Sequence, residues 1–294
     1  MDVAALEKIR SLPLWNGTPE VTVLKGGITN RNFRVVDDSS TYVVRLGDDI
    51  PVHQLSRQNE VAASRAAHAA GISPAVVHHQ PGVLVLDYIC GRTLTPEDVR
   101  SPTYLERIVP LVRTCHRETG RHFRGSAMIF WPFHVIEDYA ATLAEAGSRH
   151  AGRLERLLRI SRQLEAAAAP FDIVFGHNDL LAANFLDDGK RLWLIDWDYA
   201  GYNTPLFDLG GLASNNELDE AQEKWLLEAY YEQPVRDELW RRYQAMKCAS
   251  LLRETLWSMV SELHSTIDFD YAAYTADNLA RFERAFDYFQ HSES

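Results

Sequence analysis

The fold of this chain is decided by the stretch His177-Asn178-Asp179-Leu180-Leu181-Ala182-Ala183-Asn184, which is followed by the apolar run Leu192-Trp193-Leu194-Ile195 and then by Asp196. A carboxylate such as Asp179 is able to orient or deprotonate a hydroxyl nucleophile. An amide oxygen at Asn184 and a second carboxylate at Asp196 are able to hold magnesium against nucleotide phosphates. The spacing therefore predicts phosphoryl transfer. The alternative is a loop whose Asp and Asn side chains only bond a turn.

The residues around this stretch are predicted to build and brace its loop. Residues 173–175 are apolar and are expected to be buried ahead of a turn at 176–178. We interpret His177 as a brace for the loop rather than as a base. Asp208 is expected to accept backbone N–H groups of the loop and to fix its geometry without reacting. Asp198 either assists a second ion or the substrate, or is only a turn residue.

The N-terminal part reads as strands at 21–24, 32–36 and 41–46, with the turn Lys25-Gly26-Gly27-Ile28-Thr29-Asn30 between the first two. A tight glycine turn points backbone N–H groups, here at Gly27, and the side chains of Thr29 and Asn30 toward phosphate oxygens. We therefore predict that these three residues bind a nucleotide cofactor. An ordinary hairpin turn would have the same sequence.

Two further features of this part are interpreted as nucleotide-binding. Arg45 lies on the third strand, and Glu60 lies on the helix expected at 56–70, where it would hold the arginine against phosphates. The alternative is a solvated surface pair, worth about 0–1 kcal/mol. Backbone groups around Asp87 and Ile89, on the strand at 83–89, are expected to pair with the adenine edge. A buried connecting strand would fit the same residues.

From about residue 96 the chain becomes mainly helical, with helices expected at 102–116, 135–169, 217–231, 235–264 and 271–290. The pattern predicts an α+β protein of two lobes. Residues 1–90 would form a small antiparallel-sheet lobe that binds the nucleotide. Residues 91–294 would form a larger helical lobe for catalysis and substrate binding, and ligands often bind at such a junction.

Composition narrows the partners of this 294-residue chain, which has a formal net charge of −11 and no basic run. Nucleic acid and anionic membranes are therefore poor partners. Cys90, Cys115 and Cys248 are far apart, and no H-x-x-x-H occurs, so a disulfide framework and a zinc site are disfavoured. The N-terminus lacks a basic-then-apolar signal pattern, so we expect a cytoplasmic protein.

Aromatic residues gather in the last third of the chain. Trp257, Tyr271 and Tyr274 are each compatible with core packing. In an acidic chain, however, such rings are also able to wall a pocket for a cationic substrate, because each aromatic face attracts an ammonium group by about 0.5–2 kcal/mol. We keep both interpretations for these three residues.

Five segments resemble the choline/ethanolamine kinase family, within the aminoglycoside-phosphotransferase-like and protein-kinase-like superfamily. They are VFGHNDLLAANFL and LWLIDWDYAGYNTPLFDLG around the decisive stretch, GGITNRNF with YVVRLG near the N-terminus, and LWSMVSELHSTIDFDYAAY near the C-terminus. The resemblance covers about residues 21–289 and implies a bilobal kinase-like fold. It also implies ATP and Mg²⁺ as cofactors and a small amino alcohol, choline or ethanolamine, as acceptor.

The resemblance also implies roles for single residues. Asp179 matches the family's catalytic base, Asn184 and Asp196 match its metal ligands, and Trp257 and Tyr274 match aromatic residues around the choline trimethylammonium group. Two positions depart from the family: Glu254 stands where a second tryptophan is common, and Asn215 where an acidic residue is expected. A free charge at Glu254 would suit a primary or differently substituted amine.

These departures leave three functions open at this point. One is a choline or ethanolamine kinase. Another is a phosphotransferase for a different hydroxylated amine, such as an aminoglycoside or thiamine. The last is a catalytically silent nucleotide-binding protein of the same fold.

Overall fold

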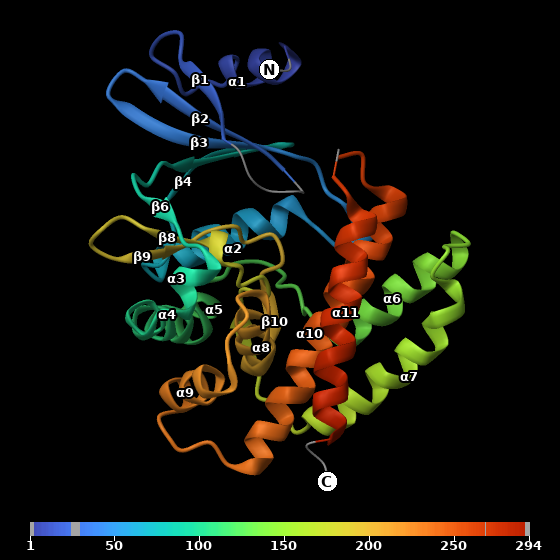
Figure 1. The fold of residues 1–294 in the computed structure, drawn as a ribbon. Coiled ribbons are helices and arrows are strands. Elements are labelled where there is room, and N and C mark those ends of the chain that lie inside the picture. The colour runs from blue at the N-terminus through green and yellow to red at the C-terminus, as the bar shows by residue number, and fades with distance from the viewer. Residues whose placement is uncertain (1–2, 25–29, 268, 292–294) are drawn as a thin grey trace.

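The computed structural model describes residues 3–24, 30–267 and 269–291. A β-sheet at the N-terminal end lies above a larger helical body, and the long C-terminal helices run along one side of that body (Figure 1). Gly27 and Thr29, for which we predict nucleotide binding, lie outside the described residues. The α+β, two-lobed fold that the sequence predicts is confirmed.

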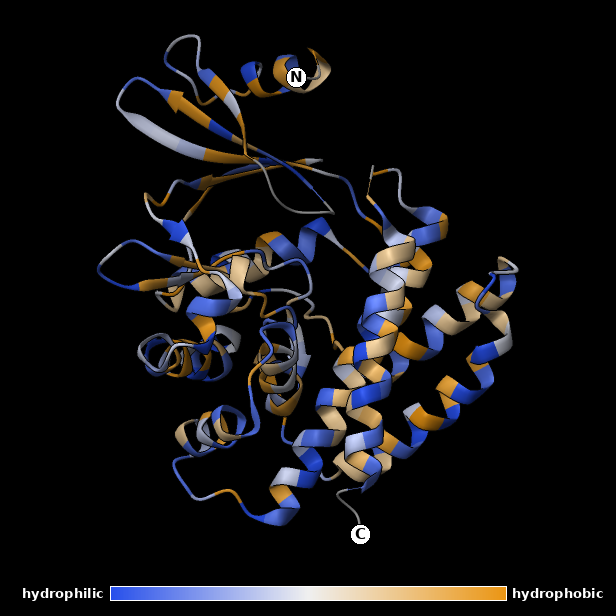
Figure 2. Cartoon of the chain, in the orientation of Figure 1, coloured by the Kyte–Doolittle hydropathy of each residue, from blue (hydrophilic) through white to orange (hydrophobic). Residues whose placement is uncertain are grey.

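The sheet is antiparallel and has the strand order β1-β2-β3-β5-β4. Its strands are β1 (Glu20–Leu24), β2 (Arg31–Asp37), β3 (Ser40–Leu46), β4 (Val76–Gln80) and β5 (Val83–Asp87). Polar and apolar residues follow one another along these strands (Figure 2). Val44 and Val85 on one face pack with Ile9 of α1 (Val3–Arg10). Successive side chains alternate between faces, so Arg45 and its partner Leu84 project from the opposite face.

That opposite face meets α2 (Arg57–Ala69), which follows the short helix η1 (Pro51–His53). Helix α2 begins after Ser56, whose side chain accepts the N–H of Asn59. The helix carries the buried Glu60 toward the sheet. Strand β4 was not expected, because its two histidines and its exposed positions do not show the apolar alternation of a strand.

The helical body is built around α10 (Asp237–His264), which packs against α6 (Pro132–Glu145), α7 (Ala151–Ala168), α8 (Pro205–Asn215) and α11 (Tyr271–His291). The body also contains α3 (Pro96–Arg100), α4 (Pro102–Thr114), the π-helix η2 (Cys115–Thr119), α5 (Gly120–His122) and α9 (Glu220–Tyr231). Our prediction of one helix over 135–169 is wrong. The chain breaks after α6 because Gly147 has φ +62°, which an α-helix does not allow.

Short strands and one 3₁₀ turn hold the decisive stretch within this body. They are β7 (Val174–Gly176), η3 (Ala182–Asn184), β8 (Phe185–Asp187), β9 (Leu192–Leu194) and β10 (Gly201–Asn203), with β6 (Arg92–Thr93) beside β8. β8 and β9 form a hairpin, so the chain leaving Asn184 returns at Ile195. Within the described ranges, every helix is too short or too polar to cross a bilayer.

Candidate active site

The loop that carries Asp179 is held from below by Asp208. Asp208 is buried in the first turn of α8, and its two carboxylate oxygens accept the backbone N–H groups of His177 at 2.8 Å and Asn178 at 2.7 Å. His116 approaches the same carboxylate at 2.8 Å. Burial acts to raise the pKa of Asp208, but the hydrogen bonds from His116 and from the loop hold that pKa below its ordinary value. Both oxygens are therefore committed to positioning the loop.

Replacing Asp208 with asparagine should loosen this loop. The amide NH₂ would face one of the two backbone N–H groups, which leaves a buried donor unpaired at a cost of about 1–3 kcal/mol. We expect kcat to fall by about 10-fold to 100-fold, because small misplacements of a catalytic group are costly. Urea unfolding and steady-state kinetics measure both effects. Asp277→Asn, on the exposed face of α11, is the matched control. If the two variants had the same stability and the same kcat, the positioning role of Asp208 would be contradicted.

The turn itself is stabilised by Asn178 and His177. Asn178 has φ +65°, a left-handed conformation that asparagine tolerates, and its side-chain amide donates to the carbonyls of Tyr199 and Gly201. The His177 ring lies 3.0 Å from the Ile195 carbonyl, and burial lowers its pKa. These contacts tie the loop to the segment that carries Asp196.

Asp179, Asn184 and Asp196 lie together at the open side of this loop. The amide of Asn184 donates to the Asp179 backbone oxygen at 2.8 Å and to its Oδ2 at 3.3 Å. The Asn184 carbonyl accepts the N–H of Ile195, the residue before Asp196. Asp196 has φ +69°, a strained conformation for a non-glycine residue outside helices and strands. Strain of this kind is common where a side chain is aimed at a ligand.

The environment of Asp179 favours its neutral form. Burial, together with the nearby carboxylates of Glu254, Asp196 and Asp198, raises the pKa of Asp179 to about 8, although the charge of Arg253 acts in the opposite direction. A carboxyl group with a pKa close to neutral is matched to proton transfer at physiological pH.

A cluster of buried charges joins the sheet to the catalytic segment. The Nη1 atom of Arg45 lies 2.6 Å from Glu60, 2.7 Å from Asp196 and 2.9 Å from Asp198. The predicted Arg45–Glu60 contact is therefore present, and it is not a solvated surface pair, because both side chains are buried. In this structure the arginine also holds Asp196, which we predict to bind metal.

Arg57 is a second arginine in this cluster that our sequence analysis missed. Its Nη1 atom lies 2.8 Å from Glu60 and 2.9 Å from Asp198. Asn30 donates to the other oxygen of Asp198 at 2.9 Å. Burial raises the pKa of Glu60 to about 7. Asp198, for which a substrate or second-ion role was one interpretation, thus has both oxygens bonded to residues of the N-terminal part.

The segment after β5 has one backbone N–H group that does not bond a described residue. The N–H of Asp87 donates to Ala75 and that of Tyr88 to Thr41. The N–H of Ile89 makes no hydrogen bond with any of the described residues. Ile89 is thus the position where the backbone is able to bond an outside partner, while the Asp87 N–H is already used.

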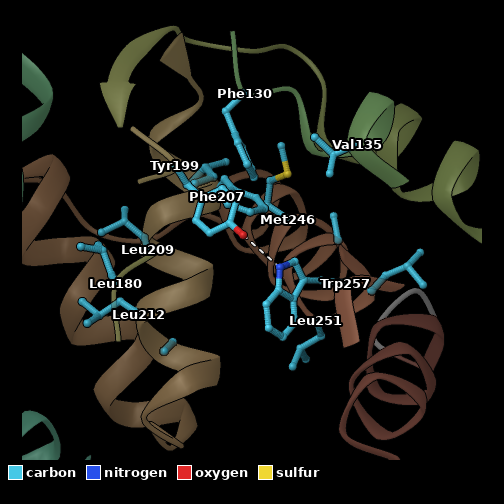
Figure 3. Close-up of a cluster of buried hydrophobic side chains, with 14 of the residues drawn as sticks. Phe130, Val135, Leu180, Tyr199, Phe207, Leu209, Leu212, Met246, Leu251 and Trp257 are labelled. Atoms are coloured by element: carbon cyan, nitrogen blue, oxygen red, sulfur yellow. Dashed lines mark hydrogen bonds between the residues drawn. The ribbon is translucent and has the colours of Figure 1, made fainter. Parts of the chain in front are cut away.

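The aromatic residues of the C-terminal helices lie together. Trp257 is buried, and its indole N–H donates to the Tyr199 hydroxyl at 2.9 Å (Figure 3). The ring centroids of Tyr271 and Tyr274 lie 6.2 Å and 6.4 Å from that of Trp257. His53 stacks on Trp257 at 5.0 Å. The cluster therefore combines core packing with polar contacts that fix the indole.

Glu254 is bonded inside the protein and does not offer a free charge. Its carboxylate accepts the Tyr274 hydroxyl at 2.8 Å and Arg253 Nη1 at 2.8 Å. Arg253, which our sequence analysis missed, is buried and lies over the Tyr199 ring at 4.5 Å. The sequence did contain a signal for Arg253, because a basic residue there directly precedes an acidic one in a mainly apolar part of the helix. Arg253 compensates Glu254 and opposes the rise of the Asp179 pKa.

The chain is similar to known proteins over most of its length. The phosphotransferase enzyme family matches residues 20–246. A solved choline/ethanolamine kinase family protein from Mesorhizobium loti is 30% identical with a TM-score of 0.80, and the alignment covers 98% of this chain and 96% of that one. The solved choline kinase LicA from Streptococcus pneumoniae is 25% identical with a TM-score of 0.78, covering 98% of each chain.

Among curated proteins, the ethanolamine kinase of Drosophila melanogaster is 29% identical over 256 residues, which are 75% of this chain and 49% of that protein. The chain thus spans about half the length of this relative. The family match and the Mesorhizobium loti structure each extend over most of the chain. The chain belongs to the phosphotransferase enzyme family and, within it, to the choline/ethanolamine kinases.

Proposed function

We infer that this protein is an ATP-dependent kinase that transfers the γ-phosphoryl group to the hydroxyl of a small amino alcohol, choline or ethanolamine. The observation that carries this proposal is the meeting of Asp179, Asn184 and Asp196 at one open loop, next to the buried cation Arg45. The names of the relatives support the acceptor class.

The residues at this loop fit a magnesium ion that is bound together with a nucleotide. Asn184 uses its NH₂ group on Asp179, and Asp196 contacts Arg45 through only one oxygen. Both therefore keep an oxygen for a hard cation. Within the described ranges, no group of three or more His, Cys, Asp and Glu side chains would enclose a metal. Asn184 and Asp196 would thus hold a magnesium ion only together with a nucleotide, and the bound ion would supply neutralisation of charge on the transferring group.

The side chains and backbone of the protein would have separate roles in the reaction. Asp179 would accept a hydrogen bond from the acceptor hydroxyl and take its proton as the new P–O bond forms. Arg45 would shift from Asp196 toward the phosphates while Glu60 retains it. The predicted turn at 26–30 would cover the phosphates, and the free N–H of Ile89 would bond adenine. Asp208 would keep the loop in position throughout.

Asp196→Asn should weaken nucleotide binding only when magnesium is present. The substitution removes the negative charge that faces the cation but keeps a side chain of the same size. We expect MgATP to bind at least about tenfold more weakly, which corresponds to about 1.4 kcal/mol. Binding of ATP without magnesium should be unchanged or tighter, because Arg45 loses one of its three carboxylate partners. Calorimetric titrations with and without Mg²⁺ test this, and an equal loss in both would refute the metal role.

The acceptor is tested by coupled ADP release with choline, ethanolamine, thiamine and several aminoglycosides. Trp257 and Tyr274 offer aromatic surface for an ammonium group. Because Glu254 is already paired with Arg253, it supplies little extra charge for a primary amine. We therefore expect turnover with choline or ethanolamine, and none with the aminoglycosides. Thermal stabilisation by ATP without ADP production from any acceptor would favour a silent nucleotide-binding protein instead.

A further inference from the structure

A cavity of about 420 Å³ is lined by residues of α2 and of the β4–β5 hairpin, and the Arg45–Glu60 pair forms part of its wall. Val61 and Ala62 of α2 and Leu84 of β5 form part of its wall. Arg124, from the segment after α5, reaches its rim. The volume is within the range of about 300–1,000 Å³ that is usual for small-molecule sites.

The charge at this cavity is strongly positive. Arg45, Arg57, Arg65 and Arg124 all line it, and Glu60 is the only carboxylate among its described lining residues. Glu60 is already bonded to Arg45 at 2.6 Å and to Arg57 at 2.8 Å. This excess is notable in a chain with a formal net charge of −11.

Part of this charge has no partner within the protein. Arg65 and Arg124 are exposed, and across residues 3–24, 30–267 and 269–291 neither forms an ion pair or a hydrogen bond. The Nη2 atom of Arg57 is buried and also lacks a hydrogen bond to a described residue. Guanidinium groups that line a cavity and outnumber its carboxylates bind phosphate well, because their planar N–H pairs match its oxygens.

We propose that this cavity, named here the α2 cavity, binds a small organic phosphate. Arg57, Arg65 and Arg124 would hold the phosphate group. Val61, Ala62 and Leu84 would contact the carbon skeleton. Arg45 and Glu60 line the α2 cavity and also belong to the proposed nucleotide site. Asp179, Asn184, Asp196 and Ile89 do not line the cavity, so we treat it as a separate site.

The test uses the full chain saturated with ADP and Mg²⁺, so that the nucleotide site is already filled. Glycerol phosphate and inorganic phosphate are titrated by calorimetry at constant ionic strength. We expect one saturable site in the wild type. The double variant R65A/R124A should bind at least about tenfold more weakly, since two charge-assisted contacts are lost. The matched control R159A/R162A removes two exposed arginines from α7 and should bind normally.

A second variant tests whether the ligand occupies the space of the cavity, independently of its charge. Ala62→Phe would fill the space beside Leu84, so it should block glycerol phosphate and spare inorganic phosphate. Three outcomes would each overturn the proposal. The wild type fails to bind either phosphate, the two double variants bind with equal affinity, or sodium chloride reproduces the calorimetric signal. None of these outcomes depends on kinase activity, so a failure here is separate from a failure of the proposed function.

Discussion

Asp179→Asn is expected to reduce kcat by about 10²–10⁴ while leaving the affinity for MgATP nearly unchanged, because a positioned general base usually contributes a factor of that size. The same substitution is expected to increase stability. In the folded protein burial raises the pKa of Asp179 from 3.8 to about 8. The charged carboxylate is thus disfavoured in the native state, and an amide removes that penalty at nearly constant shape.

The sign of the pH dependence follows from that shift. Below pH 4 the carboxyl group is neutral in both the folded and the unfolded chain, so the variant and the wild type should be equally stable. As pH rises toward 8, the unfolded chain ionises and the folded site resists ionisation, so the wild type loses stability relative to the variant. Thermal melts at several pH values measure the difference. Near-normal turnover, or a difference that is independent of pH, would contradict this account.

Arg45→Met is expected to have the largest effect on stability. Arg45 is buried against Glu60, Asp196 and Asp198, and its removal leaves these acids with only the partial compensation of Arg57. Breaking a buried ion pair from one side costs about 3–5 kcal/mol. The loss should be smaller at pH 5 than at pH 8, because burial raises the pKa of Glu60 to about 7 and this acid becomes neutral as pH falls. The KM for ATP should rise at least about tenfold, since the phosphates lose a cation.

Two companion variants identify the cause. Arg45→Lys keeps the charge but not the planar geometry, so its stability should lie between those of Arg45→Met and the wild type. Arg159→Met makes the same chemical change on the exposed surface of α7 and should be neutral. Urea unfolding at pH 5 and pH 8 distinguishes these cases. A pH-independent loss in Arg45→Met would indicate altered packing and not uncompensated charge.

Local patterns were sufficient for much of the architecture. The motif around Asp179 and Asp196 consists of polar residues separated by short distances in the sequence, so it can be recognised from the sequence alone. The alternation in β2 and the helical spacing of apolar residues in α4 also report local periodicity. Helical spacing of apolar residues continues on both sides of Gly147, so this pattern does not show that the chain breaks there. The interruption between α6 and α7 was therefore missed.

By itself, the sequence determined the antiparallel sheet, the helical body, the grouping of Asp179 with Asn184 and the family. Only the tertiary structure decided which charges meet. Arg57 and Asp198 are 141 residues apart, and Asn30 and Asp198 are 168 apart, yet both pairs are hydrogen-bonded. Contacts across such separations are set by how the sheet, α2 and the catalytic segment pack together, and no local spacing encodes them. For the same reason the proximity of Arg253 to Asp179 is evident only from the packing of α10 against the catalytic loop.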